Sequence, residues 1–307
     1  MQHWLIFIFI IALLVWLFMT FHYKLREQFV GTIQQSQQST YNLPKIMWSF
    51  WDSKELPEQI RLIHENRAKK LEQYGWKLYM LNGKTVGDYI DLSNLPKNFD
   101  KLIVQHKADY YRLLLLQKYG GVWIDASIII NNPGAINDLY NESVQKHSEF
   151  TGFTLEPGPG ITDRSKYIEN WFIMVPVGSP IIDKWLTEFI SAIDSGLDNY
   201  IPRVKEEGVH IVDRISSYLT QHACMQTVLQ KRLGRPANII LKDAEKDMFK
   251  IQTDCNWELN CLLDKFKTNI AEIRKIPYIK LRGGERDFDI KEYFAKEGFG
   301  NRVGYAA

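Results

Sequence analysis

Cysteine and net charge are both scarce in this sequence of 307 residues. The three cysteines, Cys224, Cys255 and Cys261, form no CxxC pair, which argues against a scaffold built on disulfides and against a cysteine zinc site. One pair could still form a bridge in an oxidising compartment. Lysine and arginine number 38 against 36 acidic residues, a net charge of +2 that excludes a polycationic nucleic-acid-binding protein. The 45% hydrophobic and 24% charged residues are typical of a folded globular chain.

Charged side chains are absent from the stretch between Trp4 and Tyr23. A helix of about 20 apolar residues, at about 1.5 Å per residue, spans the hydrocarbon layer of a bilayer. A cleaved signal peptide has a charged start, a shorter apolar core and a small-x-small cleavage site, none of which is evident here. A buried core helix would have to cover every face of this segment. We therefore predict a transmembrane signal anchor at 4–23, after a short tail at 1–3, and a single-pass membrane protein.

Two signals point to opposite sides of the membrane for the rest of the chain. Lys24 and Arg26 follow the apolar stretch, and positive charge there favours a cytosolic catalytic part. The sequon Asn141-Glu142-Ser143 favours a lumenal one, in a Golgi-like compartment. Both orientations stay open.

The remainder is predicted to be a polar stem followed by one α/β domain. The stem covers 24–42 and is rich in Gln and Ser toward its end, and the domain covers 43–307. The domain opens with a strand at 45–51, a helix at 57–74 and a strand directly after it. This alternation predicts a mostly parallel sheet with helices on its faces.

The most informative stretch is residues 107–127, KADYYRLLLLQKYGGVWIDAS. Asp109 and Arg112 are three positions apart, so they project from one face of the expected helix. A Gly-Gly pair ends that helix, and we expect a buried strand over 122–130 that carries Asp125. An aspartate among such apolar residues is costly to bury without a charged or metal partner. Near the carboxyl end of a strand, where α/β sheets bind ligands, it suits hydroxyls or a divalent cation.

This stretch resembles the DXD region of glycosyltransferases, in which a helix bearing Asp-x-x-Arg leads through Tyr-Gly-Gly into a strand that ends in Asp-x-Asp. It is most similar to the capsular polysaccharide synthesis family, within the wider family 32 sugar transferases. Mannosyltransferases of the yeast outer-chain initiating type and large clostridial glucosylating toxins look like more distant relatives. Two further segments agree, Leu-Pro-Lys-Ile-x-Trp-x-x-Trp-Asp at 43–52 and the Glu-Asn-Trp-Phe-Ile and Ser-Pro-Ile-Ile motifs within 169–182, and the likeness extends over 43–232.

The resemblance implies a fold and an activity. The fold is a GT-A type, Rossmann-like nucleotide-sugar-binding domain. The activity is that of a membrane-anchored glycosyltransferase, which moves a sugar from a UDP- or GDP-sugar donor to a glycan or glycolipid acceptor with retention at the anomeric carbon. The alternative is a non-catalytic nucleotide-sugar- or glycan-binding protein with a degenerate DXD motif. A metal-dependent hydrolase would need a second cluster of acids or histidines, and none is evident in the sequence.

The resemblance also implies roles for individual residues, by their positions in the motifs. The tryptophans stack on the donor base, the acids contact sugar hydroxyls, the arginine contacts the sugar and phosphate, and the asparagine lies near the reaction centre. The implied donor-binding residues are Trp48, Trp51, Asp109, Arg112 and Asp125. The implied catalytic residues are Asp125, Arg112 and Asn170.

One position departs from the motif, because Ser127 stands where the second carboxylate of the DXD would be. A hydroxyl is a weaker and neutral oxygen ligand, so a cation would bind less tightly or be held mainly by the donor phosphates. The resemblance still predicts Mn²⁺ or Mg²⁺ at Asp125 and Ser127. A third ligand is expected from a C-terminal loop, and His222, Asp254 and Glu285 are left open as candidates.

Overall fold

The computed structural model describes residues 19–20, 24, 41–155, 167–213, 215–286 and 291–295. The chain divides into two units, residues 1–41 and 42–307, and the strands of the described part all belong to the second. Within the described ranges, no helix has the length and apolar character needed to cross a bilayer. The anchor predicted at 4–23 lies, apart from two residues, outside them.

The helices and strands alternate along the first half of the chain and become mainly helical afterwards. The described strands are β1 (Ile46–Phe50), β2 (Lys77–Leu81), β3 (Gly121–Ile124), β4 (Ile128–Ile130), β5 (Phe150–Leu155), β6 (Tyr167–Val175), β7 (Ile239–Asp243) and β8 (Tyr278–Lys280). The earlier α-helices are α2 (Glu58–Glu72), α3 (Val104–Tyr119), α4 (Pro133–Gln145), α5 (Pro180–Ser195) and α6 (Leu197–Glu206). The later ones are α7 (Thr220–Thr227), α8 (Lys250–Asp254), α9 (Leu259–Thr268), α10 (Ile270–Ile273) and α11 (Lys291–Ala295).

The central sheet has the order β2-β1-β3-β6-β5-β7 in the described part of the chain. Strand β1 is parallel to both β2 and β3, β6 is antiparallel to β3 and to β5, and β7 is parallel to β5. Five of these strands therefore point the same way and β6 alone is reversed. The fold is mixed α/β, and the expected mostly parallel sheet is observed.

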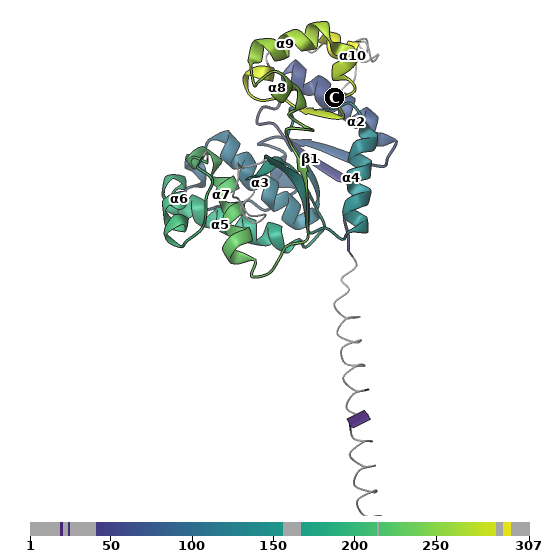
Figure 1. Cartoon of the computed structure of the whole chain (residues 1–307). Coiled ribbons are helices and arrows are strands. Elements are labelled where there is room, and N and C mark those ends of the chain that lie inside the picture. The colour runs from purple at the N-terminus through teal and green to yellow at the C-terminus, as the bar shows by residue number, and fades with distance from the viewer. Residues whose placement is uncertain are drawn as a thin grey trace, which may run out of the picture. The chain divides into compact units, whose positions relative to one another are not determined.

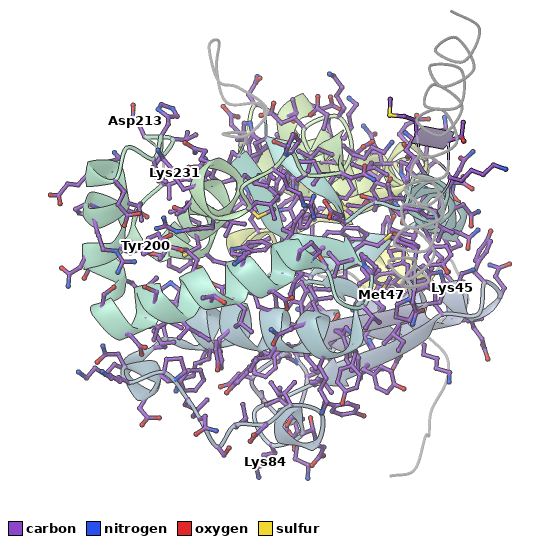
Figure 2. All side chains as sticks on the ribbon, turned by 90° about the horizontal axis from the view of Figure 1, so that it is seen from below. Lys45, Met47, Lys84, Tyr200, Asp213 and Lys231 are labelled. Atoms are coloured by element: carbon purple, nitrogen blue, oxygen red, sulfur yellow. A yellow bond between two sulfur atoms is a disulfide. The ribbon has the colours of Figure 1, made fainter. Side chains whose placement is uncertain are left out.

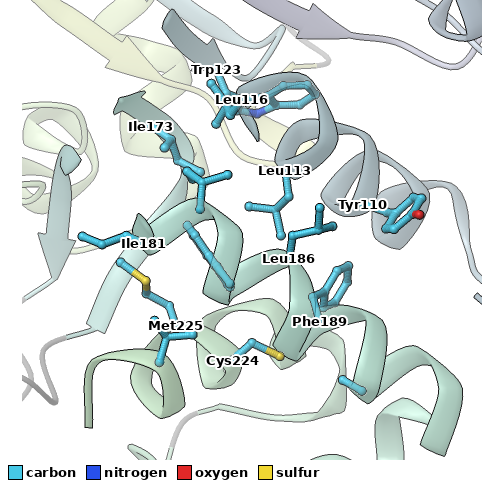
Figure 3. Close-up of a cluster of buried hydrophobic side chains, with 14 of the residues drawn as sticks. Tyr110, Leu113, Leu116, Trp123, Ile173, Ile181, Leu186, Phe189, Cys224 and Met225 are labelled. Atoms are coloured by element: carbon cyan, nitrogen blue, oxygen red, sulfur yellow. The ribbon is translucent and has the colours of Figure 1, made fainter. Parts of the chain in front are cut away.

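Helices cover both faces of this sheet. Helices α3, α5, α6 and α7 lie together on one side, and α2 and α4 lie on the other (Figure 1). Figure 3 shows the core between the sheet and α3, α5 and α7, filled by buried apolar side chains. Its labelled members are Tyr110, Leu113, Leu116, Trp123, Ile173, Ile181, Leu186, Phe189, Cys224 and Met225.

The Gly-Gly pair between α3 and β3 is required by geometry. Gly120 and Gly121 have φ angles of 62° and 87°, which side chains other than glycine rarely adopt. A Cβ on Gly120 would lie 2.7 Å from the backbone nitrogen of Val177, and one on Gly121 would lie 2.5 Å from the carbonyl oxygen of Ile46. The pair thus lets α3 end and β3 enter beside β1 without a clash.

The single strand expected over 122–130 is wrong. Strand β3 ends at Ile124, and β4 begins at Ile128 in a different, two-stranded sheet with β8. A turn closed by the hydrogen bond from the Ile128 amide to the Asp125 carbonyl, 3.2 Å long, separates the two. The turn carries Asp125 and Ser127, so the DXD-like segment lies between two sheets rather than along one strand.

The C-terminal helices form a second hydrophobic cluster with β4, β8 and α2. It includes Ile129, Ile279, Phe266 and Ile63. Helices α8, α9 and α10 lie together above the sheet in Figure 1. Cys255 and Cys261, at the start of this region, are joined by a disulfide, whereas Cys224 is a buried free thiol.

The view from below separates the start of the sheet from the α6 region. Figure 2 shows Lys45 and Met47, at the start of β1, on one side and Tyr200 of α6, with Lys231 and Asp213, on the other.

Candidate functional site

Asp109 and Arg112 form an ion pair on α3, on the face predicted from their spacing. Arg112 Nη1 donates to Asp109 Oδ1 over 2.6 Å, and the arginine and aspartate side chains are 5% and 12% exposed. Burial raises the pKa of Asp109 by more than the positive charge of Arg112 lowers it. An ion pair buried this deeply stabilises a fold only weakly, since both charges lose their hydration. A buried pair with a perturbed pKa is more typical of a functional site.

Two amide side chains add further hydrogen bonds to this pair. Asn170 on β6 donates from Nδ2 to Asp109 Oδ1 at 3.1 Å and to Gln221 Oε1 at 2.8 Å. Gln221 on α7 accepts from Arg112 Nη1 at 2.7 Å and donates to the Asp109 carbonyl at 2.7 Å. Its backbone carbonyl in turn accepts from Trp185 of α5 at 2.8 Å, which fixes it to the core. Three helices and one strand thus hold this cluster.

Asp125 joins the cluster from the turn after β3. Its Oδ1 accepts hydrogen bonds from Arg112 Nη2 at 3.2 Å and from Trp123 Nε1 at 3.0 Å, and its Oδ2 lies 3.0 Å from Lys280 Nζ. Burial alone would raise the pKa of Asp125, but the charges of Lys280 and Arg112 and the hydrogen bonds from Lys280 and Trp123 outweigh it and lower the pKa. The carboxyl is therefore ionised at neutral pH, with a side chain 27% exposed.

Arg67 supports the same turn from α2, on the other face of the sheet. Its guanidinium donates to the Asp125 carbonyl at 3.1 Å and to Ser49 Oγ at 3.1 Å, and Ser49 donates to the Ile124 carbonyl at 2.6 Å. Burial lowers the pKa of Arg67 to about 10, with the negative charge of Asp125 acting in the opposite direction. Arg67 and Ser49 thus hold the backbone that presents Asp125, while Arg112 and Lys280 bond its carboxylate.

Ser127 is buried and is bound by the C-terminal strand. It donates to the Leu281 carbonyl at 2.9 Å and accepts from Lys280 Nζ at 2.9 Å. The structure thus brings Asp109, Arg112, Asn170, Asp125 and Ser127 together, through direct bonds and the shared partner Lys280.

The two tryptophans assigned to the donor base lie in different surroundings. Trp48 is 2% exposed, stacks on Tyr79 at 4.9 Å between ring centres, and donates to the Gly120 carbonyl at 3.2 Å. Trp48 is therefore a residue of the hydrophobic core in this structure. Trp51, after the end of β1, is half-buried, and the Arg286 guanidinium lies over its ring at 5.6 Å. Of the two, Trp51 alone keeps surface that a base could stack on.

The protein groups at the DXD-like turn do not fit a divalent cation well. Among the described residues, no cluster of three His, Cys, Asp or Glu side chains is arranged to hold a metal. Of the two predicted ligands, Asp125 already accepts three hydrogen bonds, and Ser127 is bonded on both sides. A bidentate or bridging contact to Mn²⁺ or Mg²⁺ would have to displace Lys280 from these oxygens.

The three residues considered as a further ligand have other partners. His222 lies on α7 rather than in a C-terminal loop, with Nε2 3.4 Å from Glu169 Oε2 and its ring stacked on Tyr167. Asp254 pairs with Lys250. Glu285 is buried and accepts from Arg282 and, at 2.8 Å, from Gln252. The bonds of Asp254 and Glu285 lie within the C-terminal region itself.

Sequence reasoning missed the residues that reach the site from the second half of the chain. Gln221 lies 109 positions from its partner Arg112, and Lys280 lies 153 positions from Ser127. Neither belongs to a local motif. The one available signal was the lysine within the short apolar segment IPYIKL, where a charge is unexpected in a buried strand.

Comparison with known proteins places the chain in a family. Residues 19–260 match the model of the capsular polysaccharide synthesis protein family. The O-glycosyltransferase braB of Annulohypoxylon truncatum is 30% identical over an alignment of 159 residues. The match covers 47% of this chain, and the chain spans 37% of the length of this curated relative.

Solved structures of low sequence identity resemble parts of the fold. A glycosyltransferase involved in glycosylation of the major capsid of PBCV-1 is 15% identical, with a TM-score of 0.44 over 79% of this chain and 96% of that one. The glycosyltransferase GlyE of Streptococcus pneumoniae TIGR4 is 13% identical, with a TM-score of 0.40 over 85% of this chain and 61% of that one. It is the family match, over most of the sequence, that decides: the chain belongs to the capsular polysaccharide synthesis protein family.

Proposed function

We propose that this protein is a glycosyltransferase that moves a sugar from a UDP- or GDP-sugar to a glycan or glycolipid acceptor. The observation that carries the proposal is the buried polar cluster at the end of β3, in which Asp109, Arg112, Asp125, Asn170 and Gln221 are joined by hydrogen bonds. So many buried polar groups are costly for a fold and are well suited to bind a polar ligand. The glycosyltransferase name of the 30% identical relative supports the same activity.

The charges in the cluster suit a sugar diphosphate. Arg112 is 4% exposed and its Cζ lies over the ring of Trp123 at 4.8 Å, so its planar guanidinium is held in one orientation. A fixed guanidinium binds phosphate oxygens in a bidentate manner. The carboxylates of Asp109 and Asp125 are acceptors for sugar or ribose hydroxyls. Trp51, with Arg286 over its ring, is suited to stack on the base.

We assign the domain to the GT-A type and the reaction to the retaining class. The sheet with one reversed strand, and the acidic turn after β3, are compatible with the GT-A assignment. The cluster includes no glutamate, so a front-face route without a covalent sugar–enzyme intermediate suits the described residues. Asn170, which bonds both Asp109 and Gln221, is the side chain assigned to the sugar near its reacting carbon.

We further propose that an anchor at 4–23 keeps the enzyme at a membrane, where a glycolipid or membrane-bound glycan is the acceptor. The apolar composition of that segment supports the anchor. The disulfide between Cys255 and Cys261 favours an oxidising, lumenal side for the catalytic unit, since such bonds persist outside the cytosol.

The proposal is tested on the full chain in detergent micelles with a panel of UDP- and GDP-sugars. Binding is measured by calorimetry, and turnover by release of free nucleoside diphosphate with and without candidate acceptors. We expect one donor to bind and to be turned over. An Asp109→Asn variant is expected to lose this binding, while Asp183→Asn, an exposed aspartate on α5, is expected to retain it.

The alternative activity is separated by the same measurement. Tight donor binding without release of nucleotide, with all acceptors tried, would favour a non-catalytic sugar-nucleotide-binding protein. A protein that binds no donor would exclude both functions for this cluster.

A further inference from the structure

Lys280 occupies the place between the two DXD-like positions. Its Nζ lies 3.0 Å from Asp125 Oδ2 and 2.9 Å from Ser127 Oγ, so one ammonium bridges both side chains. In the DXD pattern these two positions are both carboxylates. In this chain the second carboxylate is replaced by a hydroxyl, and the lysine of a distant segment bonds both the remaining carboxylate and that hydroxyl.

The backbone holds Lys280 in this place. Strands β4 and β8 pair antiparallel with Ile128 opposite Lys280, and the Leu281 amide donates to the Ser127 carbonyl at 3.1 Å. The Lys280 carbonyl accepts from Gln252 at 2.7 Å, and the side chain is 12% exposed. The lysine therefore reaches the turn because of strand register.

The third donor of the ammonium is only weakly bound within the protein. A lysine ammonium carries three N–H groups, of which two point to Asp125 and Ser127. The third makes a long hydrogen bond of 3.4 Å to the Leu281 carbonyl, which a ligand oxygen can replace. Arg112 lies on the other oxygen of Asp125 at 3.2 Å, so the carboxylate sits between two cations. A divalent ion at the same oxygens would meet like charge on both sides.

We propose that the Lys280 ammonium replaces the divalent cation of the DXD site, so that the protein binds the nucleoside diphosphate and stabilises its departure without a metal. The inference rests on the proposed glycosyltransferase function and deepens it. Lys280 and Arg112 together bind the diphosphate oxygens, and Asp125 orients both. Ser127 is a neutral partner of the ammonium, so Asp125 is the one negative side chain that the ammonium bonds here.

The transfer step balances without a metal. The bond between the anomeric carbon and the diphosphate oxygen breaks, and its electron pair leaves with the diphosphate. The acceptor hydroxyl oxygen forms the new bond to that carbon, and its proton passes to the departing diphosphate. Lys280 stabilises the negative charge that develops on the departing oxygens, as positively charged groups do for phosphoryl leaving groups.

The first test removes the charge. Lys280→Met keeps the length and apolar stem of the side chain, and is compared in the full chain with Lys275→Met, a lysine of a surface ion pair with Glu272. For the donor that wild type turns over, we expect Lys280→Met to lower kcat about 100-fold, and Lys280→Arg to recover part of the loss. Lys275→Met is expected to behave as wild type. Equal kcat in wild type and Lys280→Met would overturn the proposal.

The second test measures metal directly and does not depend on turnover. Binding of Mn²⁺ is followed by electron paramagnetic resonance, with and without UDP or GDP, in wild type and in Asp125→Asn. We expect wild type and Asp125→Asn to give the same Mn²⁺ signal, because Asp125 holds no Mn²⁺. We also expect EDTA to leave the binding of the nucleoside diphosphate unchanged. Mn²⁺ binding lost in Asp125→Asn, or transfer abolished by EDTA and restored by Mn²⁺, would overturn the lysine assignment while leaving the glycosyltransferase function intact. Failure to bind any nucleoside diphosphate or donor would instead overturn the proposed function, and this inference with it.

Discussion

Helix α3 contributes to two regions of opposite character. Its leucines at 113, 115 and 116 are fully buried among the apolar side chains of the core, while Asp109 and Arg112, on the same helix, are buried among polar ones. The apolar region is stabilised by the hydrophobic effect, which requires closely packed side chains but no specific hydrogen-bond partners. The polar region is held by named hydrogen bonds. We expect substitutions in the first region to affect stability, and substitutions in the second to affect binding and turnover.

The largest effect is expected in the apolar region. Leu113→Ala removes a fully buried side chain and leaves a cavity, which should lower the free energy of unfolding by about 2–5 kcal/mol. Leu114→Ala, at the neighbouring half-buried position, is the matched control and should cost less. Chemical denaturation measures both. Turnover per folded molecule should be unchanged in both variants, and a loss of turnover in Leu113→Ala would contradict the separation of the two regions.

Next in size is the loss of the carboxylate at Asp125. Asp125→Asn removes the charge that orients Arg112 and Lys280, and should slow transfer by about 100- to 1,000-fold, as the loss of one electrostatic group in an active site does. Arg112 keeps Asp109 and Gln221 as partners and Lys280 keeps Ser127, so the free energy of unfolding should change by less than about 1 kcal/mol. Steady-state kinetics and thermal melting are compared with those of Asp183→Asn. Transfer at the wild-type rate would remove Asp125 from the site.

A smaller effect is expected from keeping the charge and changing its shape. Arg112→Lys keeps a cation but loses the planar group that bonds Asp109, Gln221 and Asp125 together. Donor affinity should fall about tenfold, because a lysine binds phosphate as a point charge. Calorimetry with the donor measures this, and Arg61→Lys, in an exposed ion pair on α2, is the control. Unaltered donor affinity would show that Arg112 stabilises the fold but does not bind the donor phosphate.

The smallest effect is expected in the dependence of the free energy of unfolding on acid pH, through Asp125. The charges of Lys280 and Arg112 and two hydrogen bonds overcome the effect of burial and hold the pKa of Asp125 below its ordinary value of 3.8. A carboxyl with a lowered pKa stabilises the folded state above about pH 4, and this stabilisation is lost as the pH falls through the lower folded value. Urea unfolding from neutral to acid pH should therefore show the stability of wild type approaching that of Asp125→Asn below about pH 4. A difference that grows on acidification would reverse the assigned direction.

Much of the polar site was predictable because its first members are close in sequence. Asp109 and Arg112 lie one helical turn apart, and the Gly-Gly pair directs the chain from α3 to Asp125 within a few residues. Local rules of helix spacing and helix ending are sufficient for such contacts. They do not identify Gln221 or Lys280, whose places depend on the packing of α7 against α5 and on the register of β4 with β8.

Trp48 and the strand at 122–130 illustrate the same limit. A tryptophan beside a buried strand carries no local sign of whether its ring packs inward or faces a ligand, and the tyrosines at 79, 89 and 119 that surround Trp48 come from three separate segments. The run of apolar residues after Asp125 suits one long strand equally well. It is the pairing of β4 with β8 that turns the chain away from the central sheet.

The sequence by itself determined the α/β class, the family and the aspartate that closely follows the Gly-Gly pair, because periodicity, glycine conformation and short motifs are local properties. Only the tertiary structure decided which charges face Asp125. An ammonium 155 positions further along the chain reaches it through strand pairing, and electrostatic interactions depend on distance in space rather than in sequence.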